Sequence, residues 1–226
     1  IDLCNRSKKV SLLVGGTMLY FRSLLNGISS MPKADQNVRD EISMEAEKYG
    51  WASLHKKLAD LDPDSANRIH PNDSQRIQRA LEVYMVSSRT MTEWRKRDRG
   101  NELLKSRKVL QFAVAPESRE FLRMTIKKRF EKMLKEGFIE EVEQLLKMRG
   151  INSSLKSMRS VGYKQVCDYL EGKLSFEDMS FKALTATYQL AKRQMTWLRS
   201  WKEIIWIPAE TPKEVSFVLK QINLRK

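Results

Sequence analysis

The fold class is indicated by one stretch near the start of the chain, Val10-Ser11-Leu12-Leu13-Val14-Gly15-Gly16-Thr17-Met18-Leu19-Tyr20-Phe21. A continuous apolar run ended by two glycines is typical of a central strand in a parallel sheet, which is covered on both faces. The turn after such a strand is where α/β proteins hold phosphates, because the amides of the next helix point at the ligand. Few residues precede this run, so we expect its neighbouring strands to come from further along the chain or from a segment that precedes Ile1.

The composition favours a globular protein with a polyanionic partner. The 226 residues carry a net charge of +14, from 42 Lys and Arg against 28 Asp and Glu, and such an excess favours nucleic acid. The two cysteines, Cys4 and Cys167, are far apart in the sequence and there are only two histidines. We therefore expect a reducing, cytoplasmic setting without disulfides or a metal site in the chain. No apolar run reaches membrane-spanning length, so we expect no membrane contact.

The pattern along the chain predicts a mixed α/β core interrupted by helices. Further strands are predicted at residues 109–115 and 204–207, and a long helix from about Phe181 to Trp201. Short apolar stripes predict a set of small helices between Asp35 and Arg99, and the basic segment from Arg89 to Lys108 is expected to be a mobile loop or arm. We divide the chain into residues 1–33, part of the α/β core; residues 34–108, a helical insertion domain; and residues 109–226, the remainder of the core with a helical C-terminal part.

Four constellations bear groups suited to phosphates and bases. The amides of Gly15 and Gly16 and the hydroxyl of Thr17 suit a phosphate or a base, but taken alone they are better explained by a turn that needs glycine for its geometry. The other three combine arginine, lysine, glutamine and aromatic side chains that can contact phosphates or stack on bases. They are Gln75-Arg76-Ile77-Gln78-Arg79, Arg159-Ser160-Val161-Gly162-Tyr163-Lys164, and Lys192-Arg193-Gln194-Met195-Thr196-Trp197-Leu198-Arg199.

Each of these three also has a simpler interpretation. A solvated helix face explains the first and the third, and a helix entry with Tyr163 packed inward explains the second. The sequence contains neither the G-x-x-x-x-G-K-[ST] pattern of a phosphate-cradling loop nor a Ser/His/Asp arrangement, and its acidic residues lack metal-ligand spacing. The chemistry is therefore not visible as a general acid and base.

Taken together and in order, the motifs resemble those of the bacterial tRNA dimethylallyltransferases, also called tRNA isopentenyltransferases. The five matching segments are Leu13-Val14-Gly15-Gly16-Thr17-x-Leu19-Tyr20, Asp35-x-x-x-Arg39, His70-Pro71-Asn72-Asp73-x-Gln75-Arg76-x-x-Arg79-Ala80-Leu81-Glu82, Arg159-Ser160-Val161-Gly162-Tyr163-Lys164-Gln165 and Gln189-Leu190-Ala191-Lys192-Arg193-Gln194. The resemblance implies a P-loop-type, nucleotide-binding (ATP-binding) α/β core with a helical insertion domain. It also implies transfer of a dimethylallyl group from dimethylallyl diphosphate to the N6 amine of adenosine 37, beside the anticodon, in tRNAs that read codons starting with U.

The same resemblance implies roles for individual residues. Thr17 and Arg129 are the expected catalytic residues, and Gly15 and Gly16 the expected cofactor-binding residues. Magnesium ion is expected to assist departure of the diphosphate, and the expected macromolecular partner is the anticodon stem-loop of tRNA, bound by a monomer. The expected tRNA-binding residues are Thr17, Arg39, Gln75, Arg76, Ile77, Gln78, Arg79, Arg159, Ser160, Val161, Gly162, Tyr163, Lys164, Lys192, Arg193, Gln194, Met195, Thr196, Trp197, Leu198 and Arg199.

The chain departs from the family pattern at its start. The family begins with a P-loop followed by an aspartate that serves as general base, and both precede the segment that matches Leu13–Thr17. We therefore expect the 226 residues alone to bind RNA without catalysing transfer. An RNA-binding fragment is thus the alternative to the enzyme. A small-molecule kinase of the P-loop type is a further alternative, disfavoured by the basic composition and by the Gln75–Arg79 segment.

Overall fold

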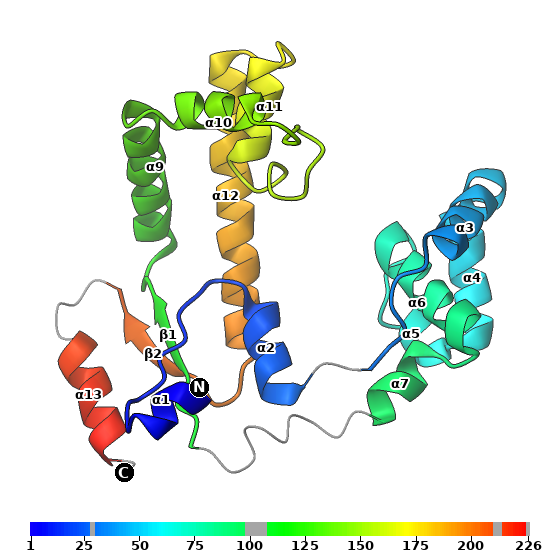
Figure 1. Cartoon of the computed structure of the whole chain (residues 1–226), viewed down its shortest axis with the longest axis horizontal. Coiled ribbons are helices and arrows are strands. Elements are labelled where there is room, and N and C mark those ends of the chain that lie inside the picture. The colour runs from blue at the N-terminus through cyan, green and yellow to red at the C-terminus, as the bar shows by residue number, and fades with distance from the viewer. Residues whose placement is uncertain (28–29, 98–107, 210–213, 225–226) are drawn as a thin grey trace. The chain divides into compact units, whose positions relative to one another are not determined.

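The computed structural model describes residues 1–27, 30–97, 108–209 and 214–224. The chain forms two compact units (Figure 1). One, the helical unit, comprises Leu19–Lys108, and the other, the sheet unit, comprises Ile1–Met18 together with Val109–Lys226. The helical unit therefore begins at Leu19 rather than at residue 34. Among the described residues, no helix combines the length and the apolar character needed to cross a membrane.

The helical unit is built from short helices around one apolar core. Its helices are α2 (Met18–Asn26, of which Met18 lies in the sheet unit), α3 (Gln36–Tyr49), α4 (Trp51–Leu61), α5 (Pro63–Ala66), α6 (Ser74–Ser87) and α7 (Met91–Arg97). Helices α3, α4 and α6 contribute Ile42, Leu58 and Ile77 to the core, and each of these side chains is at most 1% exposed. Asp35, Asp62 and Asp73 cap α3, α5 and α6 by accepting backbone N–H groups at the helix starts.

A buried carboxylate fastens α7 to the rest of the helical unit. Asp62 accepts hydrogen bonds from the Ser65 amide at 3.1 Å, the Thr92 amide at 3.0 Å and the Thr92 hydroxyl at 2.7 Å. Burial raises the pKa of Asp62, but the hydrogen bonds from Thr92 and Ser65 outweigh it and hold the pKa below its ordinary value. Because residues on α5 and α7 share one carboxylate, the ionised form of Asp62 stabilises this part of the unit.

The sheet unit joins a small sheet to a second set of packed helices. Strands β1 (Phe112–Ala115) and β2 (Ile205–Pro208) pair in parallel, with Phe112 opposite Ile205 and Ala115 opposite Pro208. Its helices are α1 (Asp2–Arg6), α9 (Arg119–Lys135), α10 (Phe138–Lys147), α11 (Tyr163–Leu170), α12 (Phe176–Arg199) and α13 (Glu214–Leu224). Helices α9 to α12 bury a core of their own, in which Val142, Val166 and Met179 are fully enclosed.

The strand expected at residues 10–14 is not formed. This segment has no regular secondary structure, and Leu12 and Val14 are 79% and 86% exposed rather than buried. A strand needs a partner for its backbone groups, and in the described part of the chain β1 and β2 pair only with each other. The result is a mixed, mostly helical α/β structure with a two-stranded parallel sheet, and the P-loop-type core stays a prediction.

The segment expected to be a loop or arm at residues 89–108 is partly helical. Helix α7 occupies Met91–Arg97, with Met91 and Thr92 buried. The packing of Met91 into the core and the bonds of Thr92 to Asp62 explain why this basic stretch is ordered. Residues 98–107, which carry the remainder of the expected arm, lie outside the described residues.

We expect Asp62→Asn to lower the free energy of unfolding by about 2 kcal/mol at neutral pH, since it weakens charge-assisted hydrogen bonds in a buried site. The folded-state pKa of Asp62 is lowered, so its stabilising effect is complete above the unfolded value of about 3.9 and is lost as pH falls through the folded value. Urea unfolding followed by circular dichroism, at neutral pH and at about pH 3, measures both effects. Asp60→Asn, an exposed change on α4, is the control. Equal stability of the two variants at neutral pH would contradict this role.

Candidate nucleic-acid interface

Two motifs far apart in the sequence meet in the sheet unit. The side-chain amide of Gln194, on α12, donates a hydrogen bond of 2.8 Å to the carbonyl oxygen of Gly16. A Cβ atom at position 16 would lie only 2.7 Å from the Nε2 atom of Gln194. A side chain at position 16 would therefore force the Gln194 amide to shift, and the glycine turn lies against α12.

The glycine turn presents polar groups to solvent. Gly15, Gly16 and Thr17 are exposed, and Thr17 directly precedes the first residue of α2. A hydroxyl at a helix start, among backbone amides that favour negative charge, suits a phosphate oxygen or a base edge. The turn therefore has the polarity that the sequence predicts for it.

Helix α12, which contacts the glycine turn through Gln194, also carries an exposed basic face. Lys192, Thr196 and Arg199 recur at helical spacing and are all exposed, and Arg193 is exposed as well. Met195 and Leu198 are half-buried, while Trp197 remains 36% exposed. A basic face with an accessible aromatic ring is suited to an RNA backbone and its bases.

The Arg159–Lys164 segment divides into an anchor and an exposed edge. Gly162 has a φ of 94°, and a Cβ there would lie 3.2 Å from the Phe138 ring. The Tyr163 ring packs edge-to-face on Phe138 with centroids 5.3 Å apart, and its hydroxyl donates to Glu141, which raises the pKa of Tyr163. These contacts fix the start of α11.

The exposed edge of the same segment consists of polar side chains. Arg159, Ser160 and Lys164 face solvent, while Val161 is half-buried. The Ser160 hydroxyl donates to the Ser157 carbonyl at 2.7 Å, which keeps the turn compact. Two cations are therefore presented from a fixed turn rather than from a loose loop.

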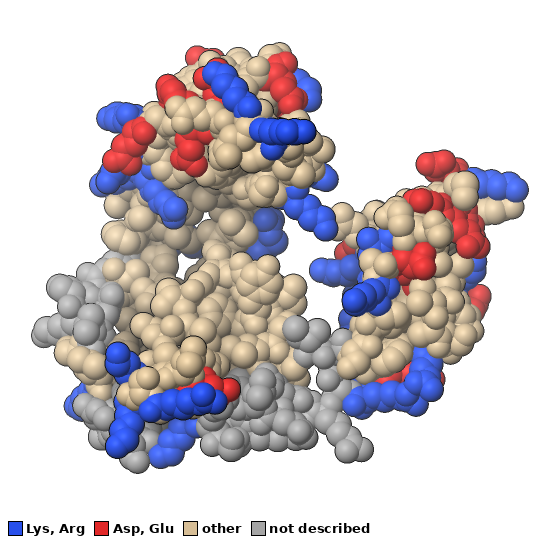
Figure 2. All heavy atoms as spheres, in the orientation of Figure 1, with Lys and Arg blue, Asp and Glu red and all other residues tan. Residues whose placement is uncertain are grey.

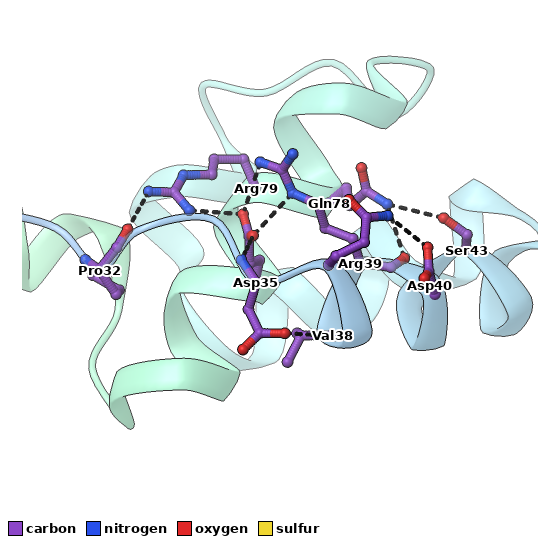
Figure 3. A network of polar contacts seen from close by, with 10 residues as sticks. Pro32, Asp35, Val38, Arg39, Asp40, Ser43, Gln78 and Arg79 are labelled. Atoms are coloured by element: carbon purple, nitrogen blue, oxygen red, sulfur yellow. Dashed lines mark hydrogen bonds and ion pairs between the residues drawn. The ribbon is translucent and has the colours of Figure 1, made fainter.

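In the helical unit, two predicted RNA-binding arginines converge on one buried carboxylate (Figure 3). Arg39 donates to Glu82 at 2.9 and 3.3 Å, and Arg79 donates to it at 2.7 Å. Arg79 also donates to the Pro32 carbonyl at 2.7 Å. Burial raises the pKa of Glu82, but hydrogen bonds from Arg79, Arg39 and the Asp35 amide keep it below its ordinary value. These contacts fix the two arginines on a buried group, and the side chains of Arg39 and Arg79 remain 36% and 30% exposed.

The rest of the Gln75–Arg79 segment is split between surface and core. Gln78 donates to the Arg39 carbonyl at 3.0 Å and to the Ser43 hydroxyl at 2.9 Å (Figure 3). Gln75 and Arg76 are exposed. Ile77 is completely buried, so its side chain serves the core and is not accessible to RNA in this structure. Arg39, Gln78 and Arg79 thus form one polar face of the unit.

Arg129, which is exposed on α9, has no hydrogen-bond or ion-pair partner among the described residues. Those residues also contain no group of three or more His, Cys, Asp or Glu side chains that could hold a metal ion. Among the described residues Arg129 therefore has no polar partner, and the expected magnesium ion stays a prediction.

Glu82 belongs to one of the matching motifs, but its link to Arg39 cannot be predicted from that motif. It lies three residues after Arg79 on α6, and a carboxylate at that spacing indicates an ion pair. Its pairing with Arg39 joins residues 43 positions apart, and nothing in the sequence alone places α3 beside α6. The carboxylate makes Arg39 and Arg79 part of the fold as well as of the polar face.

Comparison with known proteins places the chain among tRNA-modifying enzymes. The family model described as IPP transferase matches residues 1–201. The structure is similar to a tRNA Δ(2)-isopentenylpyrophosphate transferase from Staphylococcus epidermidis, with a TM-score of 0.59 and 30% identity, over 97% of this chain and 71% of that one. It is also similar to the tRNA isopentenylpyrophosphate transferase of Bacillus halodurans, with a TM-score of 0.62 and 27% identity, over 98% of this chain and 68% of that one.

A third similar structure is eukaryotic. It is a dimethylallyltransferase acting on tRNA, with a TM-score of 0.69 and 24% identity, over 99% of this chain but only 57% of that one. At this identity the similarity concerns the fold alone. The family model and the bacterial structures confirm the resemblance seen in the motifs: the chain belongs to the IPP transferase family.

Proposed function

We propose that this protein transfers a dimethylallyl group from dimethylallyl diphosphate to the N6 amine of adenosine 37, next to the anticodon, in tRNAs that read codons starting with U. The observation that carries the proposal is the contact between Gly16 and Gln194. It joins the glycine turn to α12, the helix that carries the basic face, so that a group suited to the reacting base and groups suited to RNA phosphates belong to one unit.

In the proposed reaction, the N6 nitrogen attacks the first carbon of the dimethylallyl group. A nitrogen–carbon bond forms, the carbon–oxygen bond to the diphosphate breaks, and the amine loses a proton. The Thr17 hydroxyl would orient the amine. The backbone N–H groups of Gly15 and Gly16 would donate hydrogen bonds that stabilise the negative charge on the diphosphate as it leaves. Arg129 is proposed to steady the diphosphate. We assign no general base among the described residues.

Magnesium enters the proposal only as a counter-ion of the diphosphate. Because Mg²⁺ prefers carboxylates together with substrate phosphates and water, its binding would depend mainly on the substrate. With no cluster of three or more potential ligands among the described residues, we derive no step through the ion.

The proposed tRNA contacts lie on both units. In the sheet unit they comprise Thr17, the exposed edge of Arg159–Lys164 and the basic face of α12, and in the helical unit they comprise Arg39 and the polar residues of Gln75–Arg79. All expose charged or hydrogen-bonding groups apart from the buried Ile77. Such surfaces suit the anticodon stem-loop, whose phosphates position the RNA and whose target base must leave the stack to react.

The direct test is transfer to an unmodified anticodon stem-loop RNA. The purified chain is mixed with the RNA, dimethylallyl diphosphate and Mg²⁺, and the RNA is analysed by mass spectrometry. The proposed activity predicts one dimethylallyl group on the target adenosine and none on a matched RNA in which inosine, which lacks the N6 amine, replaces it. The alternative, that these 226 residues only bind RNA because the P-loop and the general base are not among them, predicts no transfer to either RNA. Tight RNA binding without transfer would contradict the proposed activity and indicate an RNA-binding module.

We expect Thr17→Ala to reduce turnover about a hundredfold, because a hydrogen bond made at the reacting amine matters most in the transition state. The affinity for the stem-loop should change little, whereas Thr17→Ser, which keeps the hydroxyl, should retain most of the turnover. Steady-state kinetics and RNA titrations of the three proteins separate these effects. Wild-type turnover in Thr17→Ala would contradict a role at the reacting amine and leave Thr17 with a role in the turn alone.

A further inference from the structure

A second set of cations lies at the end of the helical unit formed by α5 and α7. Arg68, just after α5, donates to the Thr92 hydroxyl at 3.0 Å and to the Ser65 hydroxyl at 3.4 Å. The Thr92 hydroxyl in turn donates to the buried carboxylate of Asp62 at 2.7 Å. This chain of hydrogen bonds fixes the Arg68 guanidinium against the rigid core, which is the preorganisation that a binding site requires.

Arg95 lies close to Arg68 on the neighbouring helix. It follows Thr92 by three residues on α7, so the two side chains lie on the same side of that helix. Burial and the positive charge of Arg68 lower the pKa of Arg95, and Asp62 opposes this only in part. Two guanidinium groups close enough for the charge of one to lower the pKa of the other are stabilised when an anion binds both.

The neighbouring carboxylates are already engaged. Asp62 accepts from Ser65 and Thr92, Glu93 accepts from the amide and hydroxyl of Thr90, and Asp64 lies 3.8 Å from Lys96. In the described ranges, Arg68, Arg95 and Arg97 have no carboxylate partner. Lysine and arginine side chains gather at the end of the helical unit where Figure 1 places α7 (Figure 2). We call Arg68, Arg95, Lys96 and Arg97 the basic cluster.

We propose that the basic cluster binds backbone phosphates of the tRNA, separately from the polar face formed by Arg39, Gln78 and Arg79. Forked guanidinium donors match phosphate oxygens. Arg68 and Arg95, with Lys96 and Arg97 in the last turn of α7, concentrate positive charge at one end of the helical unit, which favours a nucleic-acid backbone. Phosphate contacts fix the position of the RNA without reading its sequence. This inference rests on the proposed tRNA substrate and adds a binding site to it.

The test is the salt dependence of RNA binding. The full chain and its Arg95→Gln and Arg97→Gln variants are titrated with the anticodon stem-loop by fluorescence anisotropy at several KCl concentrations. For each arginine removed, we expect the slope of log affinity against log salt to fall by roughly 1 and the affinity at low salt to fall by about tenfold. Lys56→Gln removes the same charge from the exposed surface of α4 and should leave the slope unchanged.

Further arms separate the possible outcomes. Arg95→Lys keeps the charge and should keep the slope, and circular dichroism confirms that the variants remain folded. Wild-type slopes in both glutamine variants would overturn the proposal, as would a wild-type protein that fails to bind the RNA. If Arg95→Gln loses RNA affinity and a low concentration of inorganic phosphate displaces the RNA from the wild type, the basic cluster is a site for free phosphate instead. If the salt-dependence slopes of the glutamine variants fall as expected but the wild type transfers no prenyl group, the basic cluster is supported and the proposed activity is contradicted.

Discussion

The arrangement of the sheet unit's candidate site depends on one hydrogen bond, from the side chain of Gln194 to the carbonyl of Gly16. The preceding residues 10–14 make no strand, so no sheet holds the glycine turn in place. A long helix provides the rigid support instead, because α12 runs from Phe176 to Arg199 and packs into the core of α9 to α12. A side chain at position 16 would push the Gln194 amide away, so the second glycine of the motif favours this contact.

In the helical unit, buried carboxylates organise the cations that face outward. Glu82 holds Arg39 and Arg79, and Asp62 holds Thr92 and, through it, Arg68. Removing water from a carboxylate is costly unless it is fully hydrogen-bonded, and both groups meet this condition. The two carboxylates thus hold helices together. They also orient arginines in advance, so that binding of an RNA would cost less side-chain entropy.

The helices and their caps could be predicted from the sequence, whereas long-range pairing could not. Periodic apolar residues and capping aspartates are local signals, and they identified the helices of the insertion and the long α12. The segment Val10–Val14 has the composition of a buried strand, but strand formation depends on a partner that composition does not reveal. The motifs are visible in the sequence, whereas the links from Glu82 to Arg39 and from Gln194 to Gly16 span 43 and 178 positions and follow only from the fold.

The most direct test of this account is a double-mutant cycle on Gly16→Ala and Gln194→Ala, with affinity for the anticodon stem-loop as the measured quantity. Either change alone removes the same contact, because a methyl group at position 16 displaces the Gln194 amide and alanine at position 194 deletes it. The account predicts that each single variant binds RNA more weakly and that the double variant binds no more weakly than either. Losses of binding free energy that simply add would show that the glycine turn and α12 act independently, and would contradict it.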